Sequence, residues 1–376
     1  MADRLALVTG GAGLIGSHLV DLLLDDGWRV RILDNLEPQT HGEGGRPGWI
    51  PAAAELCAGD VRDRRAVRTA LEGVDTVFHL AAYGGYMPEL AKFFEVNSAG
   101  TALLLETIRD EGLPVRKVVL ASSQAVYTEG AVTCPAHGLR FPPRREMAQL
   151  AAGRFDVSCP DCGGAARGAP TPERAPIGGE TVYALTKYDQ ERLALAWSRQ
   201  TGVPVVALRY ACTYGPRQSV HNPYTGVIAV FCTRLLNGLP PVLYEDGRQT
   251  RDLCYVDDVA RANLLAAETS VLDGLAVNVG TGRPVTMRHL AEVLSDLLGA
   301  SIEPEVPGEY RPGEMRALTP DIGLARSAGF EPRVALEDGL VRYLAWIREQ
   351  GRVGERFTAS RELLKRRGIV HRVSGS

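Results

Sequence analysis

No apolar run in this chain of 376 residues approaches the ~20 residues that a membrane-spanning helix requires. The formal net charge is only −3, so charge gives no reason to expect nucleic acid or a membrane surface as a partner. The first residues do not open a signal peptide, and we therefore expect a cytoplasmic protein. The seven cysteines are an odd count, which argues against a disulfide framework in a reducing compartment. What is left is an ordinary globular composition, in a chain long enough for a full domain and a smaller second lobe.

A glycine-rich turn stands near the amino terminus, between an apolar run of strand length at residues 5–9 and an amphipathic helical pattern. Its spacing fits Gly-x-Gly-x-x-Gly or Gly-x-x-Gly-x-x-Gly. Either form leaves backbone N–H groups and a helix N-terminus free to receive a pyrophosphate. The motif is weak by itself, because glycine turns also serve simple strand-to-helix packing. The glycines concerned are Gly10, Gly11, Gly13 and Gly16.

An acidic residue ends the next predicted strand, at residues 29–34. Asp34 would lie where the adenosine ribose hydroxyls bind, and it would repel a 2′-phosphate, so the sequence favours NAD over NADP. Residues 35–54 are rich in Gly, Pro and polar residues, and they form either a loop over the adenosine side or an uninvolved surface excursion. Asp60 follows a short strand; it either accepts a hydrogen bond from the adenine amino group or caps the next helix.

Further apolar strands alternate with helical patterns and indicate an α/β doubly wound sheet, with its ligand crevice over the carboxyl ends of the strands. The strand at 76–82 ends in small residues that would let its backbone approach a cofactor. We expect His79 within it to be a satisfied strand histidine and not a catalyst. Two more strands are expected at 117–123 and 204–210.

Tyr183 and Lys187 stand at i and i+4, on one face of a helix that we expect over residues 181–200. A tyrosine is ordinarily a poor base, because its pKa is near ~10. A lysine one turn away and a positive nicotinamide ring would stabilise the phenolate and move this pKa towards neutrality. The phenolate could then take a hydroxyl proton while hydride leaves the same carbon. The alternative is an ordinary surface pair.

The order and spacing of these motifs resemble the extended short-chain dehydrogenase/reductase superfamily, and within it the NAD-dependent nucleotide-sugar epimerase/dehydratase family. The resemblance covers residues 4–345 apart from one insertion. It implies a Rossmann-type doubly wound parallel sheet with a smaller mixed α/β carboxyl-terminal lobe, bound NAD, a nucleotide-diphosphate sugar as substrate and a homodimer. The motifs that carry it are Gly10/Gly13/Gly16, Asp34, Asn97, Ser123, Tyr183/Lys187, Tyr214–Gln218, Arg251–Asp252, Tyr255–Asp258 and Asn278–Gly282.

The resemblance also implies roles. Tyr183 would be the base, Lys187 would tune it and bind the nicotinamide ribose, and Ser123 would hydrogen-bond the reacting oxygen. Arg251 and Arg311 would clasp the diphosphate, which suits guanidinium groups, although Arg251 could instead only pair with a neighbouring acid. The expected cofactor-binding residues are Gly10, Gly13, Leu14, Ile15, Gly16, Asp34, Asn35, Asp60, Val61, Leu80, Ala81, Ala82, Asn97, Tyr183, Lys187 and Tyr210. The expected substrate-binding residues are Ser123, Gln124, Tyr183, Asn222, Tyr224, Arg251 and Arg311.

The residues after Ser123 bear on the reaction type. Dehydratases of the family carry an Asp-Glu pair there, and decarboxylases place a glutamate second, whereas this chain has Gln124 and Ala125. Neither can transfer a proton, which leaves a 4-epimerase: oxidation at C4 to a 4-keto sugar and return of hydride on the opposite face. The alternatives are a 4-ketoreductase, another nucleotide-sugar enzyme such as a 4,6-dehydratase or decarboxylase, and a non-catalytic NAD-binding scaffold protein.

Two local stretches, residues 222–227 and 241–249, resemble dTDP-L-rhamnose 4-epimerases, which interconvert that sugar nucleotide with dTDP-6-deoxy-L-talose. UDP-sugar epimerases share much of this pattern. Asn222 and Tyr224 are therefore either substrate contacts or loop-stabilising residues. Cys212 stands where many relatives carry an asparagine, so one phosphate contact is missing or replaced.

The segment between Tyr127 and Tyr183 is about twice as long as the family usually has. It holds two Cys-x-x-ligand pairs that can close a tetrahedral Cys₃His zinc site. Because all four positions are then filled by protein, the zinc would be structural and would hold together a Pro/Gly-rich excursion. The alternative is an insertion without metal. The expected ligands are Cys134, His137, Cys159 and Cys162.

The domain organisation follows from these stretches. We expect an NAD-binding domain at 1–215 that contains the insertion at 130–175, and a substrate-binding lobe at 216–350 with some strands returning to the large domain. In this lobe a helix should follow Thr286 and end near Gly299, with a strand at 301–306. Residues 351–376 read as a peripheral tail, a helix with a solvated charged face.

Overall fold

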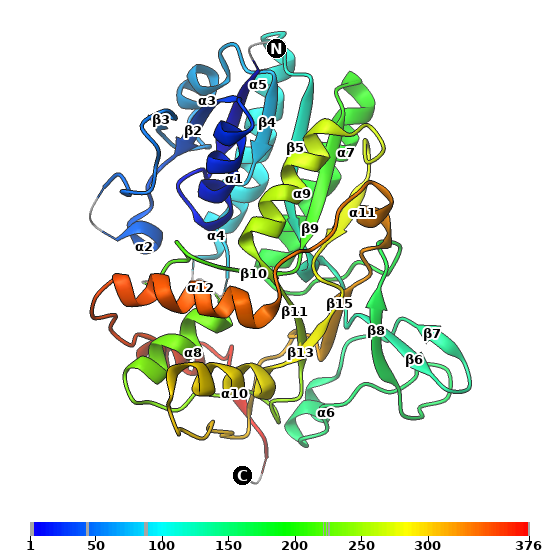
Figure 1. Ribbon diagram of the computed structural model, residues 1–376. Coiled ribbons are helices and arrows are strands. Elements are labelled where there is room, and N and C mark those ends of the chain that lie inside the picture. The colour runs from blue at the N-terminus through cyan, green and yellow to red at the C-terminus, as the bar shows by residue number, and fades with distance from the viewer. Residues whose placement is uncertain are drawn as a thin grey trace.

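The computed structural model describes residues 4–42, 45–85, 89–220, 222, 224 and 226–374. A large parallel sheet, covered by helices on both faces, forms the upper part of the molecule, and a second sheet with its own helices forms the lower part (Figure 1). None of the helices in the described part of the chain combines the length and apolar character that crossing a bilayer demands.

The large sheet has the strand order β12-β9-β5-β4-β1-β2-β3, and every neighbouring pair is parallel. This confirms the predicted Rossmann-type sheet, and one strand from beyond residue 215, β12, returns to its edge. The strands are β1 (Leu5–Thr9), β2 (Arg29–Asp34), β3 (Glu55–Ala58), β4 (Thr76–His79), β5 (Lys117–Ser123), β9 (Val205–Tyr210) and β12 (Ala276–Val279).

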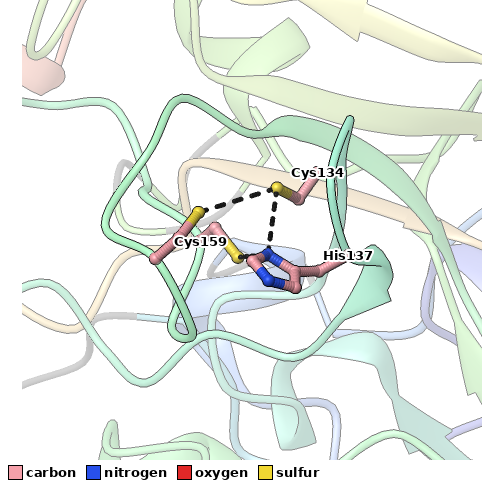
Figure 2. A group of neighbouring side chains, drawn as sticks. Cys134, His137 and Cys159 are labelled. Atoms are coloured by element: carbon pink, nitrogen blue, oxygen red, sulfur yellow. Dashed lines mark hydrogen bonds between the residues drawn. The ribbon is translucent and has the colours of Figure 1, made fainter.

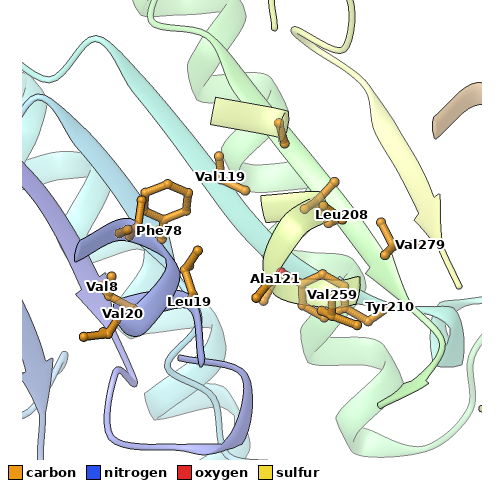
Figure 3. Packing of buried hydrophobic residues seen from close by; sticks show 14 of the residues in the cluster. Val8, Leu19, Val20, Phe78, Val119, Ala121, Leu208, Tyr210, Val259 and Val279 are labelled. Atoms are coloured by element: carbon orange, nitrogen blue, oxygen red, sulfur yellow. The ribbon is translucent and has the colours of Figure 1, made fainter. Parts of the chain in front are cut away.

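Each face of this sheet has its own core, because successive side chains of a buried strand point to opposite faces. In β1, Ala6 and Val8 pack against α1 (Leu14–Asp25) and α9 (Val256–Glu268), and Figure 3 shows the aliphatic and aromatic side chains of this layer. Leu5 and Leu7 face the opposite layer. The helices of that layer are α3 (Arg64–Leu71), α5 (Gly100–Asp110) and α7 (Val182–Thr201).

The connections that follow the carboxyl ends of the large sheet's strands contain short helices. Asn97 lies in a π-helical stretch that follows α4 and leads directly into α5. The short helices are α2 (Pro38–His41), α4 (Leu90–Phe93), the π-helix Phe94–Ala99 and the 3₁₀ helix Gln124–Val126.

The second sheet is mixed and has the order β10-β11-β15-β8-β6-β7, with β13 paired to β11. Its helices α8, α10 and α12 enclose a separate core, and α10 begins after Thr286 and ends at Gly299 as predicted. The elements are β10 (Cys212–Tyr214), β11 (Thr250–Tyr255), β13 (Pro284–Thr286), β15 (Ala317–Pro320), α8 (Val227–Leu236), α10 (Met287–Leu298) and α12 (Leu336–Glu349). The short helix α11 (Gly323–Ser327) packs instead against β12 of the large sheet.

The insertion is built into this second sheet. Its strands form the end of the sheet that projects to the side in Figure 1, and β8 pairs in parallel with β15 through Pro170 and Thr319. The excursion is thus held by backbone hydrogen bonds as well as by any metal. Its elements are β6 (Ala131–Cys134), β7 (Gly138–Arg140), α6 (Met147–Ala151) and β8 (Arg167–Thr171).

Two expectations about the carboxyl-terminal half are wrong. Residues 301–306 do not form a strand, because Glu305 makes only a single bridge, to Val242. The tail is not peripheral: Phe357 and Leu364 are buried, and β16 pairs with β14. The charged sequence of the tail concealed this packing, because two of its basic side chains, Arg361 and Lys365, are paired with one buried acid, Glu309. These elements are β14 (Glu309–Tyr310), α13 (Phe357–Arg366) and β16 (His371–Arg372).

Candidate functional site

The glycine turn folds tightly between β1 and α1. Gly10 has a φ of +69°, and a Cβ there would lie 2.9 Å from the backbone of Ala81. A Cβ on Gly16 would run into the carbonyl oxygen of Gly10, and Gly13 caps the amino end of α1. Only glycine fits these close approaches, so the turn exposes the N-terminus of α1 to the cavity above it.

Asp34 is buried at the end of β2 beside this turn. Its carboxylate accepts hydrogen bonds from the N–H of Ala12 at 3.0 Å and from the N–H of Leu36 at 2.9 Å. His41 Nε2 lies 3.7 Å from the same carboxylate. The indole of Trp49 donates to the carbonyl of Ala12 at 3.0 Å, so residues from the predicted loop at 35–54 do lie over the glycine turn.

Asp60 is held as an ionised acceptor. Hydrogen bonds from Arg62 lower the pKa of Asp60 to about 2, and Asn35 donates to it at 3.0 Å. It does not cap the next helix, because Asp63 does so by accepting from the N–H of Arg65. Asp60 therefore keeps its carboxylate at the wall of the cavity.

Two buried polar residues lie behind this wall. Asn97 exchanges hydrogen bonds with the backbone of Tyr83 at 2.8 and 2.9 Å and donates to Thr186 at 2.9 Å, so its amide joins the loop after β4 to α7. It does not line the cavity. Both ring nitrogens of His79 have hydroxyl partners, which confirms the satisfied strand histidine.

Tyr183 and Ser123 come from α7 and β5 and hydrogen-bond to each other at the wall of the cavity. Burial raises the pKa of Tyr183, and the hydrogen bond with Ser123 opposes that rise. The protein groups alone therefore do not lower the pKa of Tyr183 as we predicted. The reason is that Lys187 is itself buried: its pKa falls to about 7, and its ammonium donates to Gln190 at 2.9 Å.

Gln124 lies beside this pair and has spare hydrogen-bonding capacity. Its Nε2 donates to the sulfur of Cys212 at 3.3 Å, whereas its Oε1 has no partner among the described residues. The side chain lines the cavity although the residue is only 5% exposed. Burial raises the pKa of the Cys212 thiol, so Cys212 is a neutral neighbour here.

Arg251 and Arg311 come together from β11 and from the loop after β14, and both line the cavity. They share one acid: Glu314 lies 3.6 Å from Arg251 and accepts from Arg311 at 3.0 and 2.6 Å. Burial alone would raise the pKa of Glu314, but the two guanidinium groups outweigh it and lower the pKa. Two cations against one anion leave a net positive charge, which suits a diphosphate.

Asn222 and Tyr224 also line the cavity. The side-chain oxygen of Asn222 accepts from the N–H of Tyr224 at 3.0 Å, so Asn222 stabilises its own loop. The residues that flank these two in the sequence, His221, Pro223 and Thr225, lie outside the described residues.

One cavity of about 700 Å³ joins these groups. With the exception of Asn97, every residue that the sequence assigned to cofactor or substrate contributes to its wall. Sequence reasoning missed several further lining residues, of which four carry buried polar atoms without a partner among the described residues. These four are His41, Gln218, Tyr244 and Gln249, and the apolar Phe357 lines the wall as well.

The four predicted metal ligands meet in the insertion, and Figure 2 shows Cys134, His137 and Cys159 with their sulfur and nitrogen atoms turned towards one another. His137 Nδ1 lies 3.6 Å from the sulfur atoms of Cys134 and Cys159, and the sulfur atoms of Cys134 and Cys162 are 3.9 Å apart. Tetrahedral zinc bonds would give separations of about 3.6 Å and about 3.8 Å. The donor set and its spacing therefore fit zinc.

Buried ion pairs fix the insertion to segments that lie beside the second sheet. Arg145 pairs with Glu129 and with Glu245, each at 2.9 Å, and Arg316 reaches the other oxygen of Glu245 at 3.0 Å. Its neighbour Arg144 lines the cavity and donates to the carbonyls of two loops of its wall. The insertion thus forms part of the wall of the cavity.

Comparisons with known proteins agree with this geometry. The pattern of the "NAD dependent epimerase/dehydratase family" matches residues 6–147 and 160–280. The chain is 35% identical over 352 residues to the dTDP-L-rhamnose 4-epimerase of Burkholderia thailandensis, covering 92% of this chain and 95% of that protein. It is 31% identical over 355 residues to the UDP-N-acetyl-α-D-glucosaminuronate decarboxylase of Bacillus cytotoxicus, covering 91% and 97%.

A solved structure, the UDP-glucose 4-epimerase of Thermus thermophilus in complex with NAD, superposes with a TM-score of 0.72 at 30% identity, covering 92% of this chain and 99% of that one. Relatives with different reactions thus share the fold and most of the length. The chain belongs to the NAD-dependent epimerase/dehydratase family.

Proposed function

We propose that the protein is an isomerase, an NAD-dependent nucleotide-sugar 4-epimerase. The observation that carries this proposal is that Ser123 and Tyr183 line the same cavity as the glycine turn, while the adjoining Gln124 and Ala125 offer no proton to transfer. An elimination or a decarboxylation would need such an extra acid or base. Oxidation and reduction at one carbon need only the tyrosine and a hydride carrier.

The cavity fits NAD at its glycine end. The N-terminus of α1 can receive the pyrophosphate, Asp34 can accept from ribose hydroxyls, and Asp60 can accept from the adenine amino group. His41 Nδ1, buried without a partner among the described residues, adds an unused polar atom near Asp34. NAD supplies a hydride acceptor and donor when bound. Burial raises the pKa of Tyr183. The positive nicotinamide ring would oppose this rise, because it favours the phenolate form of the tyrosine.

The protein groups then divide the work. Tyr183 removes and returns the proton of the sugar hydroxyl, and Ser123 holds the same oxygen by a hydrogen bond. Arg251 and Arg311 hold the diphosphate, so the sugar can turn about that linkage and present its other face. The free Oε1 of Gln124 accepts from a hydroxyl of the sugar.

We propose dTDP-L-rhamnose and dTDP-6-deoxy-L-talose as the substrate pair. The support is the similarity to the Burkholderia thailandensis protein of that name, together with the stretches at 222–227 and 241–249. The test is to incubate the purified protein, without added cofactor, with a panel of dTDP- and UDP-sugars and to follow inversion at C4 by NMR. Inversion of dTDP-L-rhamnose is expected. A 4-ketoreductase would instead leave these sugars unchanged and would turn over only a 4-keto sugar with added reduced cofactor, and that outcome would contradict the proposal.

We propose that the cysteine–histidine cluster holds one structural zinc. Four protein ligands leave no open position for substrate or water, and the cluster lies in the insertion and not among the catalytic groups. Metal analysis is expected to give about one zinc per chain. A Cys159→Ser/Cys162→Ser variant should lose it, whereas Cys57→Ser, outside the cluster, should keep it. A wild-type protein purified without zinc, and unable to take it up, would refute the site.

We propose that the protein is a homodimer that uses the face of α5 and α7. Neighbouring elements of that face leave apolar side chains in water: Leu90 is 61% exposed, and Phe94 and Leu185 are each 48% exposed. Light scattering should give twice the chain mass. Leu185→Glu should yield a monomer, while Val341→Glu, equally exposed on α12, should not. A monomeric wild type would contradict the proposal.

A further inference from the structure

The carboxyl-terminal segment, residues 351–374, folds onto the loop that carries Arg311. β16 pairs with β14 through Tyr310 and His371, directly before that arginine. In α13, Arg361 and Lys365 each lie 2.8 Å from the carboxylate of Glu309. The segment is thus fixed to β14, at the start of the loop, by backbone hydrogen bonds and by ion pairs with a buried acid.

This fixation brings Phe357, the first residue of α13, into the wall of the cavity. Phe357 is 7% exposed and belongs to one buried cluster with Val242, Tyr244 and Leu364. Tyr224 packs against the same cluster and also lines the cavity. An apolar recess rich in aromatic side chains therefore adjoins the predicted diphosphate clasp.

The recess contains polar atoms that the described residues leave unused. The hydroxyl of Tyr244 and the Oε1 of Gln249 are buried and have no hydrogen-bond partner there. Both residues line the cavity, and the guanidinium of Arg311 lies 4.4 Å from the centre of the Tyr244 ring. Leaving such atoms unpaired costs free energy, so they indicate a bound group with both a flat apolar face and polar edges.

We infer that the carboxyl-terminal segment completes the subsite for the nucleobase of the substrate, and that Phe357 contacts the base. The inference rests on the proposed nucleotide-sugar substrate. A base has an apolar face that suits Phe357 and Tyr224, and edge donors and acceptors that suit Tyr244 and Gln249. Its diphosphate then reaches Arg311, which the same segment holds in position.

Calorimetric titration of the purified protein with dTDP, and separately with UDP, tests the inference. Phe357→Ala should raise the Kd of the nucleoside diphosphate that the wild type binds more tightly by about tenfold. The control is Leu364→Ala, a residue of the same helix and cluster that does not line the cavity; it should change the Kd less than about threefold. The NAD content of both variants should equal that of the wild type, because neither touches the glycine end.

The outcomes separate this inference from the proposed function. If the wild type binds either nucleotide and Phe357→Ala binds it with unchanged affinity, the base does not contact the segment and only the inference fails. If both variants lose affinity equally, the segment acts through stability alone and the inference also fails. A wild type that binds neither dTDP nor UDP would overturn both. Thermal denaturation of each variant, with and without nucleotide, supplies a second readout when Phe357→Ala is less stable.

Discussion

The two ends of the cavity are built in different ways. At the glycine end, the turn, Asp34 and Asp60 come from the first three strands in chain order, and neighbouring backbone groups hold each of them. At the substrate end, the wall is assembled from segments that are far apart in the chain, including Gln124, Arg251, Arg311 and Phe357. The glycine end can be recognised from local motifs. The other end depends on packing between distant segments, and the insertion and the carboxyl-terminal tail both contribute to it.

The largest effect is expected where the two ends meet. Tyr183→Phe removes the hydroxyl that we propose exchanges the proton with the sugar, so turnover should fall by about 10³-fold while NAD content stays unchanged. Steady-state kinetics with the best substrate measures this. Tyr188→Phe, on the same helix but outside the cavity wall, is the matched control and should retain its rate. A Tyr183→Phe variant with wild-type turnover would contradict the proposal that this tyrosine exchanges the proton where the two ends of the cavity meet.

The glycine end should be the less tolerant of one added carbon. Gly16→Ala places a Cβ against the carbonyl of Gly10, so the purified protein should contain at least about tenfold less NAD. Gly48→Ala, which meets no atom within 4 Å, should leave the NAD content unchanged. Extraction and quantification of the dinucleotide is the measurement, and equal content in both variants would contradict the close approach.

The substrate end should respond in KM. Arg311→Ala removes one cation of the pair that shares Glu314, and KM for the nucleotide sugar should rise by about 10- to 100-fold. The exposed Arg283, which does not line the cavity, offers Arg283→Ala as the control. NAD content should not change in either variant. A rise in KM that accompanied loss of NAD would mean that the two ends are not independent.

The smallest effect concerns Lys187, whose pKa burial lowers from 10.5 to about 7. Between these values the unfolded chain binds a proton that the folded protein has released. The free energy of unfolding therefore rises with pH in this window, by at most about 1.4 kcal/mol per pH unit. Urea denaturation of the wild type and of Lys187→Met should give a difference that is constant below pH 6 and favours the wild type increasingly above pH 7. A flat difference up to pH 9 would refute the lowered pKa.

The parts of the site that the sequence predicts are those whose geometry depends on residues close together in the chain. The Gly10 turn, Asp34 and the Tyr183/Lys187 spacing each depend on a few neighbouring residues, and the structure brings them to one cavity. The four predicted metal ligands are similar, because each Cys-x-x-ligand pair lies within one turn. Motif spacing was thus enough to predict a site residue wherever its position depends only on residues close to it in the sequence.

The parts that escaped prediction depend on contacts between distant segments. The sharing of Glu314 by two arginines, the packing of Phe357 and the role of Asn97 as a link between a loop and α7 are set by such contacts. The charge of α13 suggested a solvated helix, whereas Glu309 neutralises its inner face. Hydrophobic periodicity and residue type do not carry this information.

The most direct test follows the hydrogen at C4. A nucleotide sugar deuterated at C4, incubated with the protein in ordinary water and without added cofactor, should give the 4-epimer with its deuterium retained, because hydride leaves and returns within one site. Mass spectrometry and NMR of the product decide the matter. Loss of the deuterium to solvent, or the absence of any epimer from every sugar of the panel, would contradict the account.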